Sequence, residues 1–283
     1  MEQLLDNKTI LIAGAGGLLG TQLVAAVLAQ GANVIAADLQ VEVMRERLVK
    51  LGVKIEDSAL TLSELDITDE SSVKGLFAQF KHIDGAVNTT YPRNKTYGAH
   101  FYDVTLESFN DNLSLHLGSA FLFTQQCASY FTARQQPFSL VNISSIYGVV
   151  VPKFSIYDNT PMTMPVEYAA IKSAIQHLNK YVVAYVNDSR FRINSVSPGG
   201  IFDHQPEAFL EAYKKQTHGA GMLDVSEVLG SIMFLLSGSR VMLLGKISSL
   251  MTVLVCEVNY ENCFGNGSWA RSSTRWWSTE NFF

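Results

Sequence analysis

Cysteine is scarce in this sequence of 283 residues, which contains three: Cys127, Cys256 and Cys263. An odd number without metal-ligand spacing excludes a disulfide framework and gives no zinc motif. The pattern is typical of free thiols in a reducing compartment. We therefore expect a cytoplasmic protein without a bound metal.

Long apolar runs are also lacking. The longest candidate, Ile232 to Val255, is interrupted by Arg240 and Lys246, and the N-terminus lacks the basic and apolar regions of a signal peptide. Charged residues make up 17% of the chain and the net charge is -5, which gives no reason to expect a nucleic acid or an anionic membrane as partner. Hydrophobic residues reach 47%, enough for one large domain or two small ones with a sizeable core.

A glycine-rich turn follows the first apolar segment. Thr9 to Ala13 is typical of a strand buried in a parallel sheet, and a helical pattern runs through Leu28. Glycines between such a strand and helix tighten the turn and let the backbone approach a pyrophosphate at the helix N-terminus. A glycine run alone is a weak indication, but this context strengthens it. The residues that we expect to bind a dinucleotide here are Gly14, Gly16, Gly17, Leu19 and Gly20.

Acidic residues end the next two expected strands. Asn33 to Ala37 leads to Asp38, at the position where a carboxylate accepts hydrogen bonds from the adenine ribose. This carboxylate would repel a 2′-phosphate, so we expect NAD rather than NADP. The alternative is that Asp38 only caps the following helix. Leu60 to Leu65 precedes Asp66 and Ile67, which we expect near the adenine, while Asp69 is expected to cap a helix.

The fourth expected strand, Ile83 to Asn88, places Asn88 at the edge of the sheet where ligands bind. A polar loop from 89 to 105 follows. A long helix from Leu106 to about Phe131 then carries His116 near its middle, where a packed histidine is the alternative to a catalytic one.

A serine and a Tyr-x-x-x-Lys pattern form the expected reactive group. Ser145 follows the strand Phe138 to Ile143, where its hydroxyl would hydrogen-bond a substrate carbonyl, although a serine there is also ordinary turn chemistry. Tyr168 and Lys172 lie four residues apart in a helical run after Pro165, so they share one helix face. A lysine ammonium near a phenol lowers the pKa of the phenol, which favours acid/base chemistry near neutral pH. The alternative is an amphipathic helix that happens to contain both residues.

These motifs, in this order, resemble the short-chain dehydrogenase/reductase family over residues 8 to about 240. The segment Arg192 to Gly199 looks like the sixth strand of that family with its proline-glycine turn. The resemblance implies an α/β single domain, residues 1–240, with a doubly wound parallel sheet (the Rossmann fold), NAD(P) binding and hydride transfer. It also implies the roles of the site residues. Tyr168 would be the acid/base, Lys172 its pKa-lowering and ribose-binding partner, Ser145 the carbonyl orienter, and Pro198, Gly199 and Ile201 neighbours of the nicotinamide.

Within the family, the segments Pro198 to Asp203 and Gly221 to Asp224 resemble a bacterial subgroup associated with flagellin modification and nonulosonic (legionaminic-type) acid biosynthesis. The sequence departs from the family pattern in three places. Leu18 replaces a glycine, and His116 stands where an asparagine usually serves a proton relay. The long interval between Ser145 and Tyr168 predicts an extra flap over the substrate, from 151 to 164.

A substrate lid is expected around residues 200–221, with an amphipathic helix from Pro206 to Lys215. Lys214, Lys215 and Arg93 are candidates to bind a phosphate or carboxylate of a sugar. A solvated surface is the alternative for the lysines. The last helix that the pattern predicts runs from Val225 to Leu236.

The segment 241–283 does not resemble the family. One coding of 241–253 that the genetic code permits, read in a shifted frame, encodes a segment like the last strand of the family. We therefore hypothesise a frameshift near Arg240, which sequencing of the coding DNA tests; an authentic divergent C-terminus is the alternative. Residues 241–256 are still apolar enough to fill the last strand position.

Together these observations predict an NAD(P)-dependent oxidoreductase. It would transfer a hydride between nicotinamide and a hydroxyl or keto carbon of a small polar, sugar-derived substrate, with Tyr168 as acid/base. It would form a homo-oligomer unless the tail disrupts assembly. One alternative is a dinucleotide-binding protein with little or no turnover because of its altered C-terminus. A sugar-nucleotide epimerase or dehydratase is disfavoured because no second substrate domain follows Arg240.

Overall fold

The computed structural model describes residues 3–237 and the backbone of residues 247–250. The frameshift hypothesis near residue 240, the tail from 251 to 283, and Cys256 and Cys263 lie outside the described residues.

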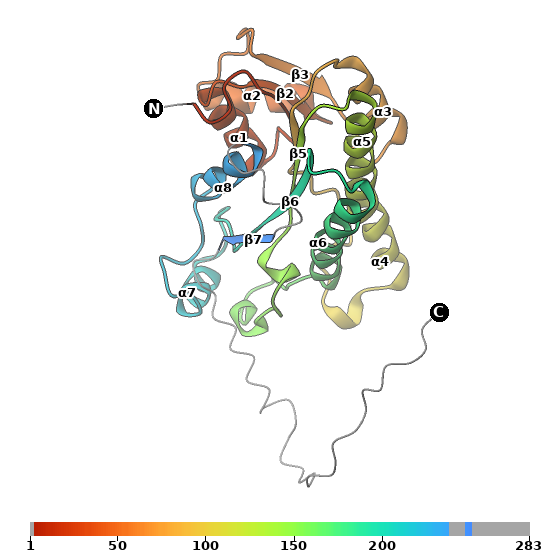
Figure 1. The fold of residues 1–283 in the computed structure, drawn as a ribbon. Coiled ribbons are helices and arrows are strands. Elements are labelled where there is room, and N and C mark those ends of the chain that lie inside the picture. The colour runs from red at the N-terminus through yellow and green to blue at the C-terminus, as the bar shows by residue number, and fades with distance from the viewer. Residues whose placement is uncertain (1–2, 238–246, 251–283) are drawn as a thin grey trace, which may run out of the picture.

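The described residues form a parallel sheet of seven strands in the order β3-β2-β1-β4-β5-β6-β7 (Figure 1). Most of the strands are apolar runs of the kind that parallel sheets bury on both faces. The strands are β1 (Thr9–Ala13), β2 (Asn33–Asp38), β3 (Leu60–Glu64), β4 (Gly85–Asn88), β5 (Phe138–Ile143), β6 (Phe191–Pro198) and β7 (Ile247–Leu250).

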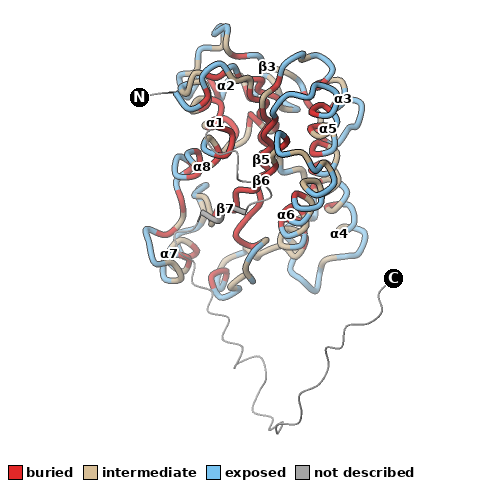
Figure 2. Tube along the Cα trace, viewed as in Figure 1, coloured by how far each residue is buried: buried red, intermediate tan, exposed pale blue. Residues whose placement is uncertain are grey.

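Helices cover both faces of the sheet (Figure 1), and the described helices are α1 (Leu18–Ala29), α2 (Val41–Lys50), α3 (Glu70–Gln79), α4 (Leu106–Asn112), α5 (Ser119–Arg134), α6 (Val166–Val186), α7 (Glu207–Lys215) and α8 (Ser226–Leu236). Alternation along the strands divides the core between the faces. Ile10 and Ile12 of β1 pack in the cluster that includes residues of α1 and α8, whereas Leu11 and Ala13 pack in the cluster that includes residues of α3 and α5. Figure 2 shows this buried layer running through the centre of the molecule. The predicted doubly wound α/β fold is confirmed.

The strand order reverses at β1, which pairs with β2 on one side and with β4 on the other. The chain moves outward from β1 to β3, then returns to the other side of β1 and moves outward again to β7. Such a reversal leaves a crevice outside the carboxyl ends of the strands, and ligands of open α/β sheets bind there. The fold therefore selects this edge as the place to look for a site.

The long helix expected from Leu106 to Phe131 is not continuous. It is divided into α4, a π-helical segment η2 (Leu113–Gly118) and α5. Hydrogen bonds in a π-helical turn span five residues instead of the four of an α-helix, and such turns are frequent at functional sites. His116 lies in this segment rather than in a regular helix.

The expected flap and lid pack against each other. Within 151–164 the chain forms a 3-10 helix, η4 (Phe154–Tyr157), which contacts α7. Ile156 and Tyr157 of η4 are buried with Phe209 and Tyr213 of α7 in one apolar cluster. This cluster lies apart from the two clusters that cover the faces of the sheet. The flap and the lid therefore form one continuous wall.

At the edge of the sheet opposite β3, β7 pairs with β6 in parallel register, from Ser195 opposite Ile247 to Pro198 opposite Leu250. This strand lies within the segment 241–256, for which we expected the last strand. Among the described helices, none has the length and apolar character that a bilayer crossing requires.

Candidate active site

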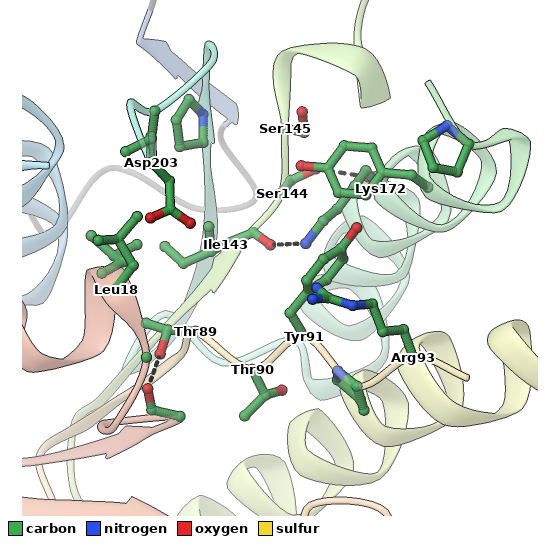
Figure 3. A pocket seen from close by; sticks show the side chains of 18 of the residues that line it. Leu18, Thr89, Thr90, Tyr91, Arg93, Ile143, Ser144, Ser145, Lys172 and Asp203 are labelled. Carbon is green, nitrogen blue, oxygen red and sulfur yellow. Dashed lines mark hydrogen bonds between the residues drawn. The ribbon is translucent and has the colours of Figure 1, made fainter. Parts of the chain in front are cut away.

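A cavity of about 940 Å³ opens at the carboxyl edge of the sheet (Figure 3). It is lined by residues that follow β1 to β6 and by the flap, the lid and α6. Of the residues predicted for the site, those that line it are Gly14, Gly17, Leu19, Asp38, Asp66, Ile67, Ser145, Tyr168, Lys172, Pro198, Gly199 and Ile201. Gly16, Gly20, Asn88 and His116 do not line it.

The glycine-rich turn fits a bound phosphate group. Gly14 has a φ of +81°, and a Cβ there would lie 2.8 Å from the Thr89 hydroxyl oxygen. Gly17 is the N-cap of α1 and has no side chain to bond the amides of this first turn. Exposed amides at a helix N-terminus form an anion site. Gly16 and Gly20 shape the turn from behind, since a Cβ on Gly20 would lie 2.1 Å from the carbonyl oxygen of Gly14.

Asp38 contacts the glycine-rich turn directly. Its Oδ2 accepts a hydrogen bond from the amide of Gly16 at 2.9 Å, and its Oδ1 accepts one from the amide of Gln40 at 3.0 Å. The N-cap of α2 is Gln40, so Asp38 is not the capping residue that the alternative interpretation required. The Arg47 guanidinium donates a hydrogen bond to the carbonyl of Gly16 at 2.6 Å. This second contact with the glycine-rich turn was not predicted from the sequence.

Asp66 and Ile67 line the same end of the cavity. Oδ1 of Asp66 accepts hydrogen bonds from the Thr68 amide at 2.9 Å and from the Thr68 hydroxyl at 2.6 Å. Oδ2 of Asp66 takes part in neither of these bonds. The prediction that Asp69 caps the next helix is confirmed, because its carboxylate accepts from the first amides of α3.

Asn88 does not reach the cavity. It is 7% exposed, and its Oδ1 accepts hydrogen bonds from the amide and the hydroxyl of Thr90, at 3.1 and 2.7 Å. Its amide group is therefore committed to the turn after β4. Of the residues around the end of β4, Thr89, Thr90 and Tyr91 line the cavity, and the binding of the cofactor by Asn88 stays a prediction.

Ser145, Tyr168 and Lys172 converge on the opposite wall. The Ser145 hydroxyl hydrogen-bonds the Tyr168 phenol. Nζ of Lys172 donates to the carbonyl of Ile143 at 2.9 Å (Figure 3). Tyr168 and Lys172 are on α6, which begins after Pro165, and their spacing of one helical turn puts both on the face toward β5.

Buried hydrogen bonds hold α6 against the strands that carry the serines. The Ser144 hydroxyl donates to the carbonyl of Lys172 at 2.8 Å. Nε2 of Gln176 donates to the hydroxyls of Ser144 and Ser197, at 2.9 and 3.2 Å. Because these groups are buried, their hydrogen bonds are costly to lose, and they fix the position of α6 relative to β5 and β6.

The expected effect of Lys172 on Tyr168 requires a correction. Burial raises the pKa of Tyr168, and the hydrogen bond from Ser145 opposes this rise. Burial also lowers the pKa of Lys172 from 10.5 to about 7. A lysine so desolvated carries only part of a positive charge near neutral pH, and its Nζ lies 5.5 Å from the centroid of the Tyr168 ring. In this site the hydrogen bond from Ser145 opposes the effect of burial on the phenol pKa.

Ser145, Tyr168 and Lys172 form what we call the reactive wall of the cavity, and His116 lies behind it. It is 3% exposed, and its Nε2 is 3.3 Å from Nζ of Lys172. Burial, together with the charge of Lys172, lowers the pKa of His116 to about 2, so the ring is neutral. Its Nδ1 has no hydrogen-bond partner among the described residues. His116 therefore contacts Lys172 rather than the cavity.

Tyr91 is in the polar loop after β4, whose residues were expected either to face a polar substrate or to be solvated, and it lines the cavity. Its ring packs edge-on against Tyr168 and His116, with centroids 5.7 and 5.0 Å apart. Lys172 Nζ lies 5.6 Å from the centroid of the Tyr91 ring, and the Tyr91 phenol hydrogen-bonds that of Tyr97. Lys172 thus lies between two aromatic rings. The place of Tyr91 shortly after the end of β4 was the indication that the sequence offered, and the contacts with Lys172 and His116 were not predicted.

The far end of the cavity is closed by the lid. Pro198, Gly199 and Ile201 line it after β6, and the amide of Gly200 donates to the phenol of Tyr213 in α7 at 2.7 Å. Of the cations proposed for an anionic substrate, Arg93 lines the cavity, whereas Lys214 and Lys215 do not. Within residues 3–237, no group of three or more His, Cys, Asp or Glu side chains is placed to hold a metal ion.

The titration of Lys172 gives a prediction about stability. We expect the free energy of unfolding of the protein, relative to that of a Lys172→Met variant, to rise as the pH increases from about 7 to 10.5. Over this range the unfolded chain holds a proton on Lys172 that the folded chain does not, because burial lowers the pKa in the folded state only. Urea-unfolding midpoints of both proteins across this range measure the difference. A flat or falling difference contradicts the assignment.

The sequence of this chain is similar to those of known proteins. The family model described as Enoyl-(Acyl carrier protein) reductase matches residues 14–249. The Post-translational flagellin modification protein A of Campylobacter coli is 35% identical over 83% of this chain and 93% of its own length. The 2,5-dichloro-2,5-cyclohexadiene-1,4-diol dehydrogenase of Sphingobium indicum is 29% identical over 77% of this chain and 84% of its own.

Among solved structures, a short-chain dehydrogenase from Leptospira borgpetersenii with bound NAD+ superposes with a TM-score of 0.76. It is 27% identical, and the match covers 88% of this chain and 92% of the other. A short-chain type dehydrogenase/reductase from Mycobacterium marinum gives a TM-score of 0.75 at 21% identity, covering 89% and 96% of the two chains, a likeness of fold alone.

Proposed function

Because this chain belongs to the short-chain dehydrogenase/reductase family and is therefore an oxidoreductase, we propose that it transfers a hydride between NAD and a hydroxyl or keto carbon of a small, polar, sugar-derived substrate. The observation that carries the proposal is the convergence of Ser145, Tyr168 and Lys172 on one wall of a cavity whose other end holds the glycine-rich turn and Asp38.

The residues of the reactive wall have distinct tasks. The Ser145 hydroxyl, already directed at the Tyr168 phenol, orients the oxygen of the reacting carbon. Tyr168 gives a proton to that oxygen during reduction or takes it during oxidation. Lys172, held by the Ile143 carbonyl and by His116, positions the cofactor ribose beside the phenol. NAD supplies or accepts the hydride when it is bound.

The cofactor end fits a dinucleotide without a 2′-phosphate. Gly14 and Gly17 leave room for a pyrophosphate next to the free amides of α1. Asp38 lines the cavity where the adenine ribose would lie. Its carboxylate accepts hydrogen bonds from ribose hydroxyls and repels a phosphate at the same place.

Replacing Asp38 tests the preference for NAD. We expect the purified protein to bind NADH more tightly than NADPH in titrations that follow nicotinamide fluorescence. An Asp38→Ser variant should bind NADH about tenfold more weakly, because hydrogen bonds to a charged group contribute roughly 1.5–3 kcal/mol. Its affinity for NADPH should rise as the repulsion is removed. Glu42→Gln on α2, which does not line the cavity, is the matched control. An equal loss for both cofactors contradicts the role of Asp38.

The sugar-derived substrate is supported by the relative from Campylobacter coli, whose name refers to flagellin modification. The substrate end of the cavity also presents hydroxyl groups, from Thr163 and several tyrosines, that suit a polyhydroxylated molecule.

We further propose that the protein is cytoplasmic and homo-oligomeric, as the composition and the family resemblance suggest. Size-exclusion chromatography with light scattering tests the second point, and a monomer at micromolar concentration contradicts it.

A further inference from the structure

Charged side chains are distributed unevenly around the cavity. Asp38 and Asp66 lie at the end assigned to the adenosine. Asp203 lies across the cavity from Arg93, near Leu18 (Figure 3). Among the described lining residues, the cations are Lys172 and Arg93. Since Lys172 is buried and already bonded to Ile143 and His116, Arg93 is the cation that faces the substrate end without such commitments.

The Arg93 side chain is held against an aromatic ring rather than by an acid. Its guanidinium carbon lies 4.9 Å from the centroid of the Tyr91 ring. Within the described residues, no carboxylate forms an ion pair with it and no hydrogen bond engages its donors. Stacking on a ring leaves the edge of a guanidinium available for two parallel hydrogen bonds.

A clamp fixes the backbone next to Arg93. The amide of Asn94 donates to Oδ1 of Asn112 at 3.0 Å, and Nδ2 of Asn112 donates back to Oδ1 of Asn94 at 3.1 Å. Nδ2 of Asn94 also donates to the Asp111 carboxylate at 2.9 Å. Asn112 is 1% exposed, so the clamp is anchored in the body of the protein. A preorganised loop reduces the entropy lost when a ligand binds.

The same ring connects Arg93 to the reactive wall. Tyr91 contacts Arg93 on one side, and its ring packs against Tyr168 at 5.7 Å between centroids. Tyr168 and Arg93 therefore both contact the Tyr91 ring, and both line the same cavity.

We propose that Arg93, stacked on Tyr91 and held in place by the Asn94–Asn112 clamp, binds an oxyanion, either a carboxylate or a phosphate, of the substrate. The inference rests on the proposed function and specifies its substrate class. The substrate is a sugar derivative with an acidic group, and the charge lies at the end of the molecule away from the cofactor adenosine. A phosphate or a carboxylate matches the planar fork of arginine in the same way.

Binding of three hexoses to the protein saturated with NADH tests this inference. Glucose is the neutral probe, glucuronate carries a carboxylate and glucose 6-phosphate carries a phosphate. Saturating NADH occupies the anion site at α1, so a remaining preference for a charged sugar arises elsewhere. Dissociation constants come from saturation-transfer NMR competition. The Arg93→Met variant keeps an apolar stem on the Tyr91 ring but removes the charge, and Arg93→Lys keeps a charge without the fork.

Arg134→Met is the matched control, because Arg134 lies 5.5 Å above the Tyr130 ring in the same kind of stack and does not line the cavity. We expect at least one charged sugar to bind about tenfold more tightly than glucose, as a charge-assisted hydrogen bond predicts. Arg93→Met should remove this preference, Arg93→Lys should retain part of it and Arg134→Met all of it. If the preference for glucuronate is lost in Arg93→Met, the bound group is a carboxylate; if the preference for glucose 6-phosphate is lost, it is a phosphate.

Two results overturn the inference while the proposed function stands: equal binding of the three sugars to a protein that binds NADH, or an unchanged preference in Arg93→Met. Failure of the protein to bind NADH overturns the proposed function, and this inference with it. Melting temperatures of the variants show whether each one is folded.

Discussion

A Tyr168→Phe variant is expected to lose hydride-transfer activity by about 10²- to 10⁴-fold, the usual contribution of a positioned acid/base group. Phenylalanine keeps the ring that packs on Tyr91 but removes the hydroxyl that Ser145 contacts. The Ser145 hydroxyl still orients the oxygen of the reacting carbon, but the group that exchanges a proton with this oxygen is gone. The measurement is the rate of NADH oxidation with the carbonyl sugar that the parent protein reduces fastest.

The same substitution at Tyr181 is the control for this experiment. Tyr181 is on the same helix as Tyr168 and is 62% exposed. Its variant should have the activity of the parent protein. NADH affinity should stay unchanged in Tyr168→Phe, because loss of turnover with intact binding separates an enzyme from a dinucleotide-binding protein without turnover. A Tyr168→Phe variant as active as the parent would remove Tyr168 from the mechanism.

A Gly20→Ala variant is expected to lose both stability and NADH binding. The added methyl group would lie 2.1 Å from the carbonyl oxygen of Gly14 and 2.8 Å from Cα of Ala15. Both are backbone atoms, so helix α1 has to move away from the turn after β1. Overpacking of this kind costs roughly 1–3 kcal/mol or more, and the displaced amides of α1 no longer face the pyrophosphate.

Gly75→Ala is the control, and we expect it to raise rather than lower the free energy of unfolding. Gly75 is in the interior of α3, and a Cβ there meets nothing within 4 Å. Alanine in an open helical position stabilises by about 0.5–1 kcal/mol relative to glycine. Denaturant unfolding and NADH titration of both variants check the pair. If Gly20→Ala is as stable as the parent and binds NADH, the glycine-rich turn is not the constraint we describe.

The features that the sequence predicts well depend on local pattern. The strand bounds of β1 and β5 are as expected, because buried parallel strands are continuous apolar runs ended by glycine or polar residues. The common face of Tyr168 and Lys172 follows from the helical repeat alone. The positions of Gly14 and Asp38 follow from the order of strand, turn and helix.

Features that depend on tertiary contacts were not predictable in this way. Asn88 ends β4 as expected, but its side-chain oxygen accepts hydrogen bonds from Thr90, and no periodicity indicates which donors a side-chain amide meets. His116, which contacts Lys172, lies in the π-helical turn between α4 and α5, and a regular helical pattern does not reveal such a turn. Tyr91 reaches the site because the Asn94–Asn112 clamp orders an irregular loop.

The pKa of Tyr168 illustrates the same limit for energetics. The spacing to Lys172 predicts proximity, but the effect of an ammonium group depends on how much of its charge survives burial. In the folded protein, desolvation lowers the pKa of Lys172 to about 7 and raises that of Tyr168. Desolvation is a property of the packed site, to which η2, α6 and the loop of Tyr91 all contribute, and a sequence motif does not report it.

The contact between the flap and the lid has an evolutionary consequence. Tyr157 and Tyr213 line the substrate end of the cavity from η4 and α7, two connecting segments that lie outside the sheet. The cofactor end is made instead by strand ends and the glycine-rich turn, which the core fixes. In evolution, substitutions in these connecting segments can therefore change the substrate that fits, without altering the strand ends and the glycine-rich turn.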